Sequence, residues 1–200
     1  MDIRLKEYSG KNILITGGAG CIGSNLTGAL LGLNARQVVV LDDLSAAERW
    51  NVPADPAVTF IEGNILDDEV LKRVFGGRVD HVFHLAAHFA NQNSVDNPET
   101  DLEVNGLGLI KVLQYSHLTR VSKSVFASSG CSVYGSQAPL PLKEDFISLH
   151  LDTPYQITKL LGELYLNFFY NYYKLPVVAA RYFNVFGPGE IPGEIGRAHV

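Results

Sequence analysis

The chain has only two cysteines, Cys21 and Cys131, which is too few for a disulfide framework or a tetrahedral zinc site. We therefore predict no metal site, and a reducing, cytoplasmic location is the simplest expectation. No apolar run is long enough to span a membrane, and the first residues lack the apolar core of a signal peptide. We accordingly expect no membrane partner.

Positive charge is also scarce, because 16 Lys and Arg residues stand against 21 Asp and Glu and the formal net charge is −5. Without a local run of Lys or Arg, this balance argues against a nucleic-acid partner. Hydrophobic residues make up 46% of the chain and charged residues only 18%. A length of 200 residues with this composition suits one domain, or one and a fraction, around a sizeable core.

Short apolar runs alternate with amphipathic stretches along the chain. The runs are rich in Val, Ile and Leu, and they predict strands buried on both faces at 12–16, 37–41, 58–61, 81–85, 124–127 and 177–180. The amphipathic stretches predict helices at 22–33, 67–75, 99–118 and 153–173, with Asp67 and Thr153 as N-caps. This alternation predicts an α/β fold with a Rossmann-like, doubly wound parallel sheet and right-handed crossovers.

Three glycines follow the first predicted strand with the spacing Gly17-x-x-Gly20-x-x-Gly23. Residues without a Cβ let the backbone approach a phosphate, and a helix that begins near Cys21 directs N–H groups at the anion. Glycines alone can serve only a tight turn, but here a strand precedes them and a helix follows. The segment therefore predicts a dinucleotide-binding loop, including the backbone of Cys21 and Ile22.

Two acidic residues, Asp42 and Asp43, stand at the end of the second predicted strand. A carboxylate at this position can accept a hydrogen bond from a ribose hydroxyl. Two acids would repel a 2′-phosphate and no basic residue follows at once, so the sequence favours NAD over NADP as cofactor. The alternative interpretation is a solvated turn.

Tyr155 and Lys159 are four residues apart in the last predicted helix and therefore share a face. An ordinary tyrosine pKa of about 10 is too high for a base at neutral pH, and a nearby ammonium lowers it. Proton transfer is most efficient when the pKa approaches the working pH. Such a pair is usually only a helix face, but after a glycine loop it predicts a catalytic pair.

Further motifs occur in a fixed order along residues 12–189. They are Thr-Gly-Gly-Ala-Gly-Cys-Ile-Gly at 16–23, Leu-Asp-Asp-Leu-Ser at 41–45, Gly-Asn-Ile at 63–65, His-Leu-Ala-Ala at 84–87, Asn105, Ser-Ser-Gly-Cys-Ser-Val-Tyr-Gly at 128–135, Tyr155-x-x-x-Lys159 and Arg-Tyr-Phe-Asn at 181–184. In their order and spacing they resemble the extended short-chain dehydrogenase/reductase superfamily, specifically its NAD-dependent nucleotide-sugar epimerase and dehydratase branch. Each motif alone is weak evidence, whereas the series is strong.

The resemblance implies cofactor contacts at the ends of the third and fourth predicted strands. Asn64 and Ile65 would flank the adenine. Leu85, Ala86 and Ala87 would line the path of the cofactor, although they could equally serve as strand-end packing.

The resemblance also assigns residues nearer the reacting groups. Asn105 would lie near the site, and Lys159 would bond the nicotinamide ribose. Phe183 would approach the nicotinamide, and Asn184 the diphosphate of the substrate. His84 is interpreted as a structural histidine rather than a base.

The family normally carries a Ser or Thr that hydrogen-bonds the reacting hydroxyl. Alignment on Val-Tyr-Gly at 133–135 places this position at Gly130, and Ser129 and Ser132 flank it. Either serine could supply the missing hydroxyl; we prefer Ser129 and leave Ser132 open. Alternatively, both serines only make hydrogen bonds within the loop.

The same segment narrows the reaction that the resemblance implies. Dehydratases of the family carry an Asp-Glu pair before Val-Tyr-Gly and decarboxylases a Glu, whereas this chain has Cys131 and Ser132. This difference argues against dehydration and decarboxylation, and it leaves epimerisation or simple ketoreduction as the reaction. A nucleophilic Cys131 would have no histidine in its sequence context, so we interpret it as a small buried residue.

These observations predict an NAD-dependent nucleotide-sugar epimerase, in which Tyr155 removes a proton from a sugar hydroxyl while hydride passes to bound NAD. The alternatives are an NAD(P)-dependent ketoreductase of the same fold and a non-catalytic NAD-binding module. We expect residues 1–175 to bind NAD and 176–193 to begin a truncated substrate-binding part. Residues 194–200 match the translation of a common sequencing adapter, so we expect a non-native tail and little turnover from this chain alone.

The two longest predicted helices carry apolar residues on more than one face, namely Leu107, Ile110, Leu113, Leu160, Leu164, Phe168 and Phe169. In relatives such helices pair across a two-fold axis, so the resemblance implies a homodimer. Alternatively these residues pack only on their own sheet.

Overall fold

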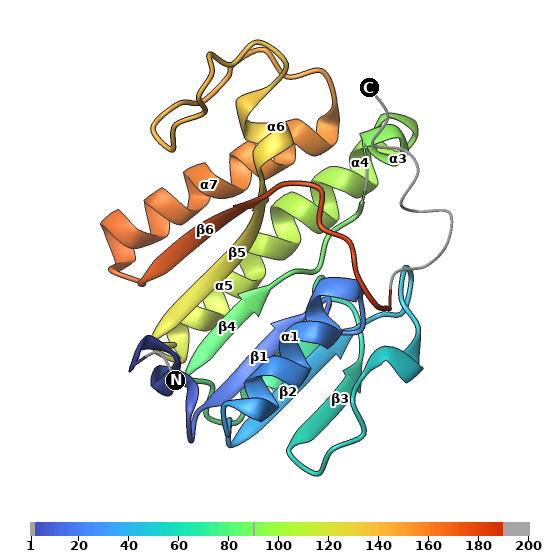
Figure 1. Ribbon diagram of the computed structural model, residues 1–200, viewed down its shortest axis with the longest axis vertical. Helices are drawn as coiled ribbons and strands as arrows, with labels where there is room; N and C mark the ends of the chain where they lie inside the picture. Colours follow the sequence, from blue (N-terminus) through green and yellow to red (C-terminus); the bar gives the residue numbers. More distant parts are fainter. Residues whose placement is uncertain (1–2, 90, 190–200) are drawn as a thin grey trace.

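The computed structural model describes residues 3–89 and 91–189 and contains one parallel sheet of six strands. The strand order is β3-β2-β1-β4-β5-β6 (Figure 1), with β1 at Asn12–Thr16, β2 at Gln37–Asp42, β3 at Val58–Glu62, β4 at His81–His84, β5 at Lys123–Ser129 and β6 at Val177–Tyr182. The order reverses between β1 and β4, so the carboxyl ends of these two strands form the switch point at which ligands of such sheets bind. The predicted doubly wound fold is confirmed.

Helices connect the strands as α1 (Cys21–Gly32), α2 (Asp68–Phe75), α3 (Asn91–Asp96), α4 (Pro98–Asp101), η3 (Leu102–Gly108), α5 (Leu109–Leu118), α6 (Gly130–Tyr134) and α7 (Pro154–Tyr173), with short 3-10 turns η1 (Ile3–Tyr8) and η2 (Arg49–Asn51). Figure 1 shows α1 lying across one face of the sheet. On this face Leu30 of α1 packs with Ile13 and Ile15 of β1. On the other face Leu14 packs with residues of α2 and α5.

Burial of the strands follows their place in the sheet. The central strand β4 is buried along its whole length, and β1 is buried from Ile13 to Thr16. The edge strands β3 and β6 are only half-buried, because each has a neighbour on one side. Burial on both faces is therefore confirmed for the inner strands, and the prediction is wrong for the two edge strands.

The predicted helix at 99–118 is in fact three segments. Between α4 and α5, η3 is a π-helical stretch, and it places Asn105 in the wider turn. Helices α3 and α6 were not predicted, since each is short and lacks a clear apolar period. The N-caps are confirmed, because Asp67 accepts from the N–H of Glu69 and Thr153 from that of Gln156.

The last strand bears on the predicted division of the chain. β6 pairs with β5 from Val177 to Tyr182, so the sheet extends past residue 175. The separation of a cofactor part from a substrate part stays a prediction, and the predicted non-native tail lies outside the described residues. Within 3–89 and 91–189, no helix is both long and apolar enough to cross a bilayer.

Candidate active site

The glycine loop joins β1 to α1 at the carboxyl edge of the sheet, where β1, β2, β4 and β5 end. Gly17 has φ +68°, and its N–H donates to the carbonyl of Leu41 at 2.8 Å. A Cβ on Gly17 would lie 2.6 Å from the backbone nitrogen of Ala86. Glycine is therefore required here both by the turn and by the close approach of the segment after β4.

The other two glycines of the loop differ in what surrounds them. A Cβ on Gly23 would lie 2.5 Å from both the carbonyl oxygen of Gly17 and the Cα of Gly18, so Gly23 permits close packing of the helix on the loop. A Cβ on Gly20 would meet protein only at 3.4 Å. Protein packing thus explains Gly23 but not Gly20, whose bare backbone at the start of α1 suits the approach of a phosphate. Cys21 and Ile22 form the first turn of α1, and both are half-buried.

The two acids after β2 have different environments. Asp42 is buried and accepts from the N–H of Ala19 and of Leu44, each at 2.9 Å. Burial raises the pKa of Asp42, and these two hydrogen bonds oppose the rise. Asp43 is exposed, and its Oδ2 accepts from Asn64 Nδ2 at 2.9 Å. Asp42 therefore fixes the glycine loop, and Asp43 joins the strand ends of β2 and β3.

The residues after β3 and β4 lie at the same edge. Ile65 is buried in the core beneath α2 and α5. The segment Leu85–Ala87 is half-buried, and the N–H of Leu85 donates to the carbonyl of Thr16 at 3.0 Å. His84 contacts Thr16 Oγ1 through Nδ1 at 2.7 Å, and burial lowers its pKa to about 3. This neutral, enclosed histidine fits the structural role that the sequence gave it.

The Tyr155–Lys159 pair is enclosed on the first turns of α7. The side chains are 8% and 3% exposed, and the ammonium lies 5.4 Å from the centre of the Tyr155 ring. Lys159 Nζ donates to the carbonyl of Ala127 on β5 at 2.9 Å. The Phe89 ring meets the Tyr155 ring edge-on at 5.7 Å. α7 thus presents the pair at the carboxyl end of β5.

The electrostatics of the pair differ from the sequence-based expectation. Burial raises the pKa of the Tyr155 phenol, and the charges of Asp101 and Cys131 raise it further. Burial lowers the pKa of Lys159 to about 8, although Asp101 opposes this. We expected Lys159 to lower the pKa of Tyr155, but in the protein alone burial raises it. An added positive charge is therefore needed to make the phenol a base.

The segment after β5 explains why a glycine stands where the family carries a hydroxyl. A Cβ on Gly130 would lie 2.1 Å from the ring of Phe183, so this ring occupies the space. Phe183 also stacks on Tyr134, with ring centres 6.0 Å apart. Ser129 Oγ accepts from the N–H of Ser132 at 3.3 Å and thereby caps α6, while Ser132 is buried. Ser129 is only half-buried at the strand end, and the choice between the two serines stays a prediction.

Two other predicted residues have surroundings that the sequence did not indicate. Cys131 in α6 is exposed, so its interpretation as a small buried residue is wrong. Asn105 is buried, and its amide is taken up by His88 and Asp101. Any contribution of Asn105 to cofactor binding would therefore pass through the backbone of His88, which its amide holds.

A third residue, Asn184, is exposed just after β6 and has φ +40°.

After β6 the chain returns to the glycine loop, as the red segment in Figure 1 shows. Asn25 Nδ2 donates to the carbonyl of Pro188 at 2.9 Å, and Asn51 Nδ2 to that of Gly189 at 3.2 Å. These bonds place Pro188 and Gly189 beside α1 and η2. The segment 183–189 therefore runs from Gly130, against which Phe183 packs, to the glycine loop and α1.

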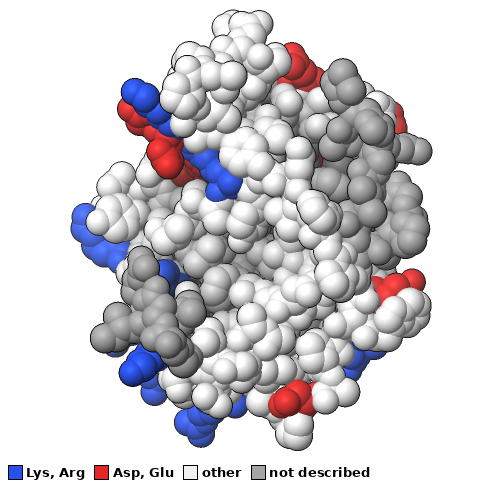
Figure 2. Space-filling model, in the orientation of Figure 1, with Lys and Arg blue, Asp and Glu red and all other residues white. Residues whose placement is uncertain are grey.

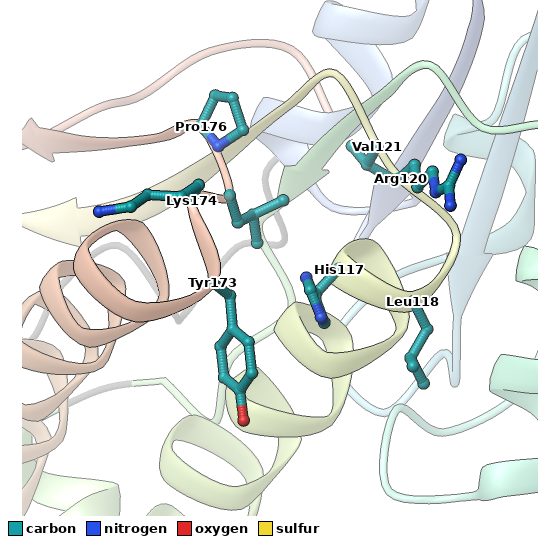
Figure 3. A pocket seen from close by; sticks show the side chains of 8 residues that line it. His117, Leu118, Arg120, Val121, Tyr173, Lys174 and Pro176 are labelled. Atoms are coloured by element: carbon teal, nitrogen blue, oxygen red, sulfur yellow. The ribbon is translucent and has the colours of Figure 1, made fainter.

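A pocket of about 460 Å³ lies at the opposite end of the strands, where β5 and β6 begin (Figure 3). It is lined by His117, Leu118, Arg120, Val121, Tyr173, Lys174, Leu175 and Pro176, which precede β5 and β6. Ligands of parallel sheets bind at the carboxyl ends of strands, so this pocket does not belong to the candidate site.

Comparison with known proteins agrees with this geometry. The family model of the NAD dependent epimerase/dehydratase family matches residues 13–200. The chain belongs to this family. It is 36% identical over 185 residues to a putative UDP-glucose 4-epimerase of Methanocaldococcus jannaschii, covering 92% of this chain and 59% of that protein.

Solved structures of the family are also close. An epimerase of Methanothermobacter thermautotrophicus has a TM-score of 0.92 and 61% identity, covering 94% of this chain and 56% of that one. The Bordetella bronchiseptica enzyme WbmF in complex with NAD+ has a TM-score of 0.82 and 39% identity, covering 92% and 53%. The chain therefore spans little more than half the length of these family members.

The fold also gathers site residues that the sequence analysis missed. Asp101 and Thr158 are both buried, and Thr158 Oγ1 donates to Asp101 Oδ2 at 2.7 Å. Thr158 precedes Lys159 on α7, so the bond lies next to the pair. A polar residue inside the Tyr-x-x-x-Lys motif was the available signal, but its partner lies 57 residues away in the sequence.

Proposed function

We propose that the full-length protein containing this chain is an NAD-dependent epimerase of nucleoside-diphosphate sugars. The observation that carries the proposal is the buried Tyr155–Lys159 pair, held at the same end of the sheet as a glycine loop in which a Cβ on Gly20 would meet protein only at 3.4 Å. The relatives support it, since a Thermotoga maritima UDP-glucose 4-epimerase was solved with UDP-glucose and shares 38% identity with the chain.

The residues at the loop fit NAD. The backbone at Gly20 would receive the pyrophosphate, and the Asp42 carboxylate retains lone pairs for a ribose hydroxyl beside its two backbone bonds. Asp42 and Asp43 together disfavour a 2′-phosphate. Bound NAD would supply a reversible hydride acceptor, whose positively charged nicotinamide ring favours a nearby phenolate.

Tyr155 is the proton acceptor in this proposal. The phenolate would take the proton of a sugar hydroxyl as the attached carbon loses hydride, and the phenol would return that proton when hydride is delivered to the opposite face of the keto sugar. Lys159 holds the adjacent positive charge, and its bond to Ala127 fixes where that charge lies. Enclosure by Phe89 limits water at the phenol.

The first test is turnover of the full-length protein on UDP-glucose and UDP-N-acetylglucosamine, with epimers measured by NMR and no added cofactor. Tyr155→Phe should lower turnover by about 10²-fold or more while bound NAD is retained. Tyr170→Phe, an exposed position on the same helix, is the matched control and should keep turnover. Wild-type rates in Tyr155→Phe would refute the assignment, and stoichiometric consumption of NADH on keto substrates would favour the ketoreductase.

We further propose that the protein is a homodimer that associates through η3 and α7. Leu107, Leu164 and Phe168 are 46%, 51% and 45% exposed, whereas Leu113 and Phe169 are buried in their own core. Exposed apolar side chains on adjacent helices are suited to burial against a second copy. Light scattering of the full-length protein should give twice the monomer mass, and the Phe168→Glu variant should give the mass of a single monomer.

We also propose a cytoplasmic location for the protein. The support is its cysteine usage, since two cysteines in 200 residues are too few for the disulfide framework typical of secreted domains. Fractionation of cells that express the full-length protein tests this.

A further inference from the structure

Asp101, the last residue of α4, is a carboxylate with no exposed surface. Its two oxygens each accept one hydrogen bond, from Thr158 Oγ1 and from Asn105 Nδ2, both at 2.7 Å. Two donors match the ionised form of the acid: burial raises the pKa of Asp101, and the hydrogen bonds from Thr158 and Asn105 oppose that rise. A buried carboxylate is costly without hydrogen bonds and a compensating charge, so this arrangement calls for a cation nearby.

The network around Asp101 joins three separate parts of the site. Thr158 lies on α7 between Tyr155 and Lys159, and its hydroxyl also contacts the carbonyl of Tyr155 at 3.2 Å. Asn105 of η3 donates to the carbonyl of His88 at 3.0 Å, and its Oδ1 accepts from the N–H of His88 at 2.8 Å. The carboxylate thus connects the catalytic helix to the segment that follows β4.

Two basic side chains, His88 and Lys159, act electrostatically on this carboxylate, and Lys159 is the buried one. Lys159 has 3% exposure, and its ammonium donates to a neutral carbonyl, that of Ala127. Burial lowers the pKa of Lys159 and the charge of Asp101 raises it. The same charge adds to burial in raising the pKa of Tyr155. Asp101 therefore acts on both members of the pair.

We propose that Asp101 is a positioning residue for the Tyr155–Lys159 pair: through Thr158 it anchors the turn that carries them, and its charge keeps Lys159 an ammonium. The role rests on the proposed function, because it assigns Asp101 a part in setting the pH range of proton transfer. The other titratable groups that face the pair are His84, His88 and Cys131. His84 is neutral at working pH, so it does not replace the carboxylate.

Asp101→Asn is the matched variant, because it removes the charge and keeps both hydrogen bonds. The new amide oxygen accepts from Asn105, while the amide nitrogen donates to the Thr158 hydroxyl, which can accept as well as donate. Without the negative charge, both the ammonium of Lys159 and the neutral phenol of Tyr155 are less favoured. Both pKa values fall, so both limbs of the pH–rate profile move to lower pH, by about one unit. Thr158→Val keeps the acid but removes one of its hydrogen bonds, so its limbs should move less than those of Asp101→Asn.

A direct titration separates this proposal from the proposed function. In full-length protein labelled with ¹³C at lysine Cε, the Lys159 resonance is assigned by its loss in Lys159→Arg. It should titrate near pH 8 in the wild type, at lower pH in Asp101→Asn and with a smaller shift in Thr158→Val. This readout needs no turnover, so an inactive wild type would refute the epimerase and leave the role of the carboxylate testable.

Two outcomes would overturn the proposal: an unshifted Lys159 titration in a folded Asp101→Asn protein, or an equal shift in Thr158→Val. The second would mean that loosening of the helix, rather than loss of charge, moves the pKa. Thermal unfolding establishes that each variant is folded. If Asp101→Asn does not fold, Asp101→Ser is the second neutral variant, for which the same shift is expected.

Discussion

At the residue scale, Gly130 shows how a missing side chain can have a physical cause. The ring of Phe183, from the end of β6, lies where a Cβ at 130 would be. The sequence revealed only that the usual hydroxyl was missing. Its cause lies in a residue 53 positions further on, which the fold alone brings into contact.

Gly130→Ser should therefore destabilise the protein rather than improve the site. The added Cβ would meet the Phe183 ring at 2.1 Å, and overpacking of this kind costs about 1–3 kcal/mol. Chemical denaturation measures the loss. In the double variant with Phe183→Ala most of the stability should return, so a strictly additive double-mutant cycle would contradict the contact.

Also at this scale, alanine substitutions of Gly20 and Gly23 should affect different properties, namely NAD affinity and stability. Gly23→Ala places a Cβ 2.5 Å from backbone atoms and should lower the unfolding free energy even without cofactor. Gly20→Ala meets protein only at 3.4 Å, so stability should be kept while NAD affinity falls by about tenfold or more. Thermal unfolding and calorimetric NAD titration of both variants check this. Unchanged NAD affinity in Gly20→Ala would remove the phosphate assignment.

At the scale of elements, α7 joins the site to the end of the sheet. Glu163 lies one turn after Lys159, is buried, and binds Arg181 of β6 through Nε at 2.9 Å and Nη2 at 2.7 Å. It also accepts from Ser128 Oγ of β5. The hydrogen bond with Glu163 raises the pKa of Arg181, so the guanidinium is charged at any working pH.

Glu163→Ala should cost about 3 kcal/mol, because it leaves the mostly buried Arg181 without its partner. The expected result is a lower denaturation midpoint, since β6 is an edge strand held on one side only. The control is Lys72→Ala, which breaks the exposed Lys72–Glu69 pair and should leave the midpoint unchanged. Equal effects of the two variants would show that the buried pair does not hold β6.

At the scale of the whole molecule, the strand order decides where chemistry can occur. Since β1 and β4 are neighbours although two strands separate them in the sequence, the connections after them diverge to opposite sides and leave the carboxyl edge open. The glycine loop, Asp42 and the Tyr155–Lys159 pair all lie along that edge. On the face in Figure 2 charged residues are scattered around the rim, with no continuous basic patch.

The sequence by itself determined the strands, the parallel α/β class, the glycine loop and the Tyr155–Lys159 spacing, because each depends on a local pattern: apolar runs, residues without a Cβ, or two side chains one turn apart. Packing in the folded chain decided three other features: the partial burial of the edge strands β3 and β6, the π-helical form of η3 and the exposure of Cys131.

Only the tertiary structure placed Asp101 against Thr158 and Phe183 against Gly130. It also buried Tyr155, which raises the pKa of the phenol in the protein alone, since that pKa depends on how much water and which charges surround the group. Residue spacing carries neither quantity, because burial results from packing of the whole chain.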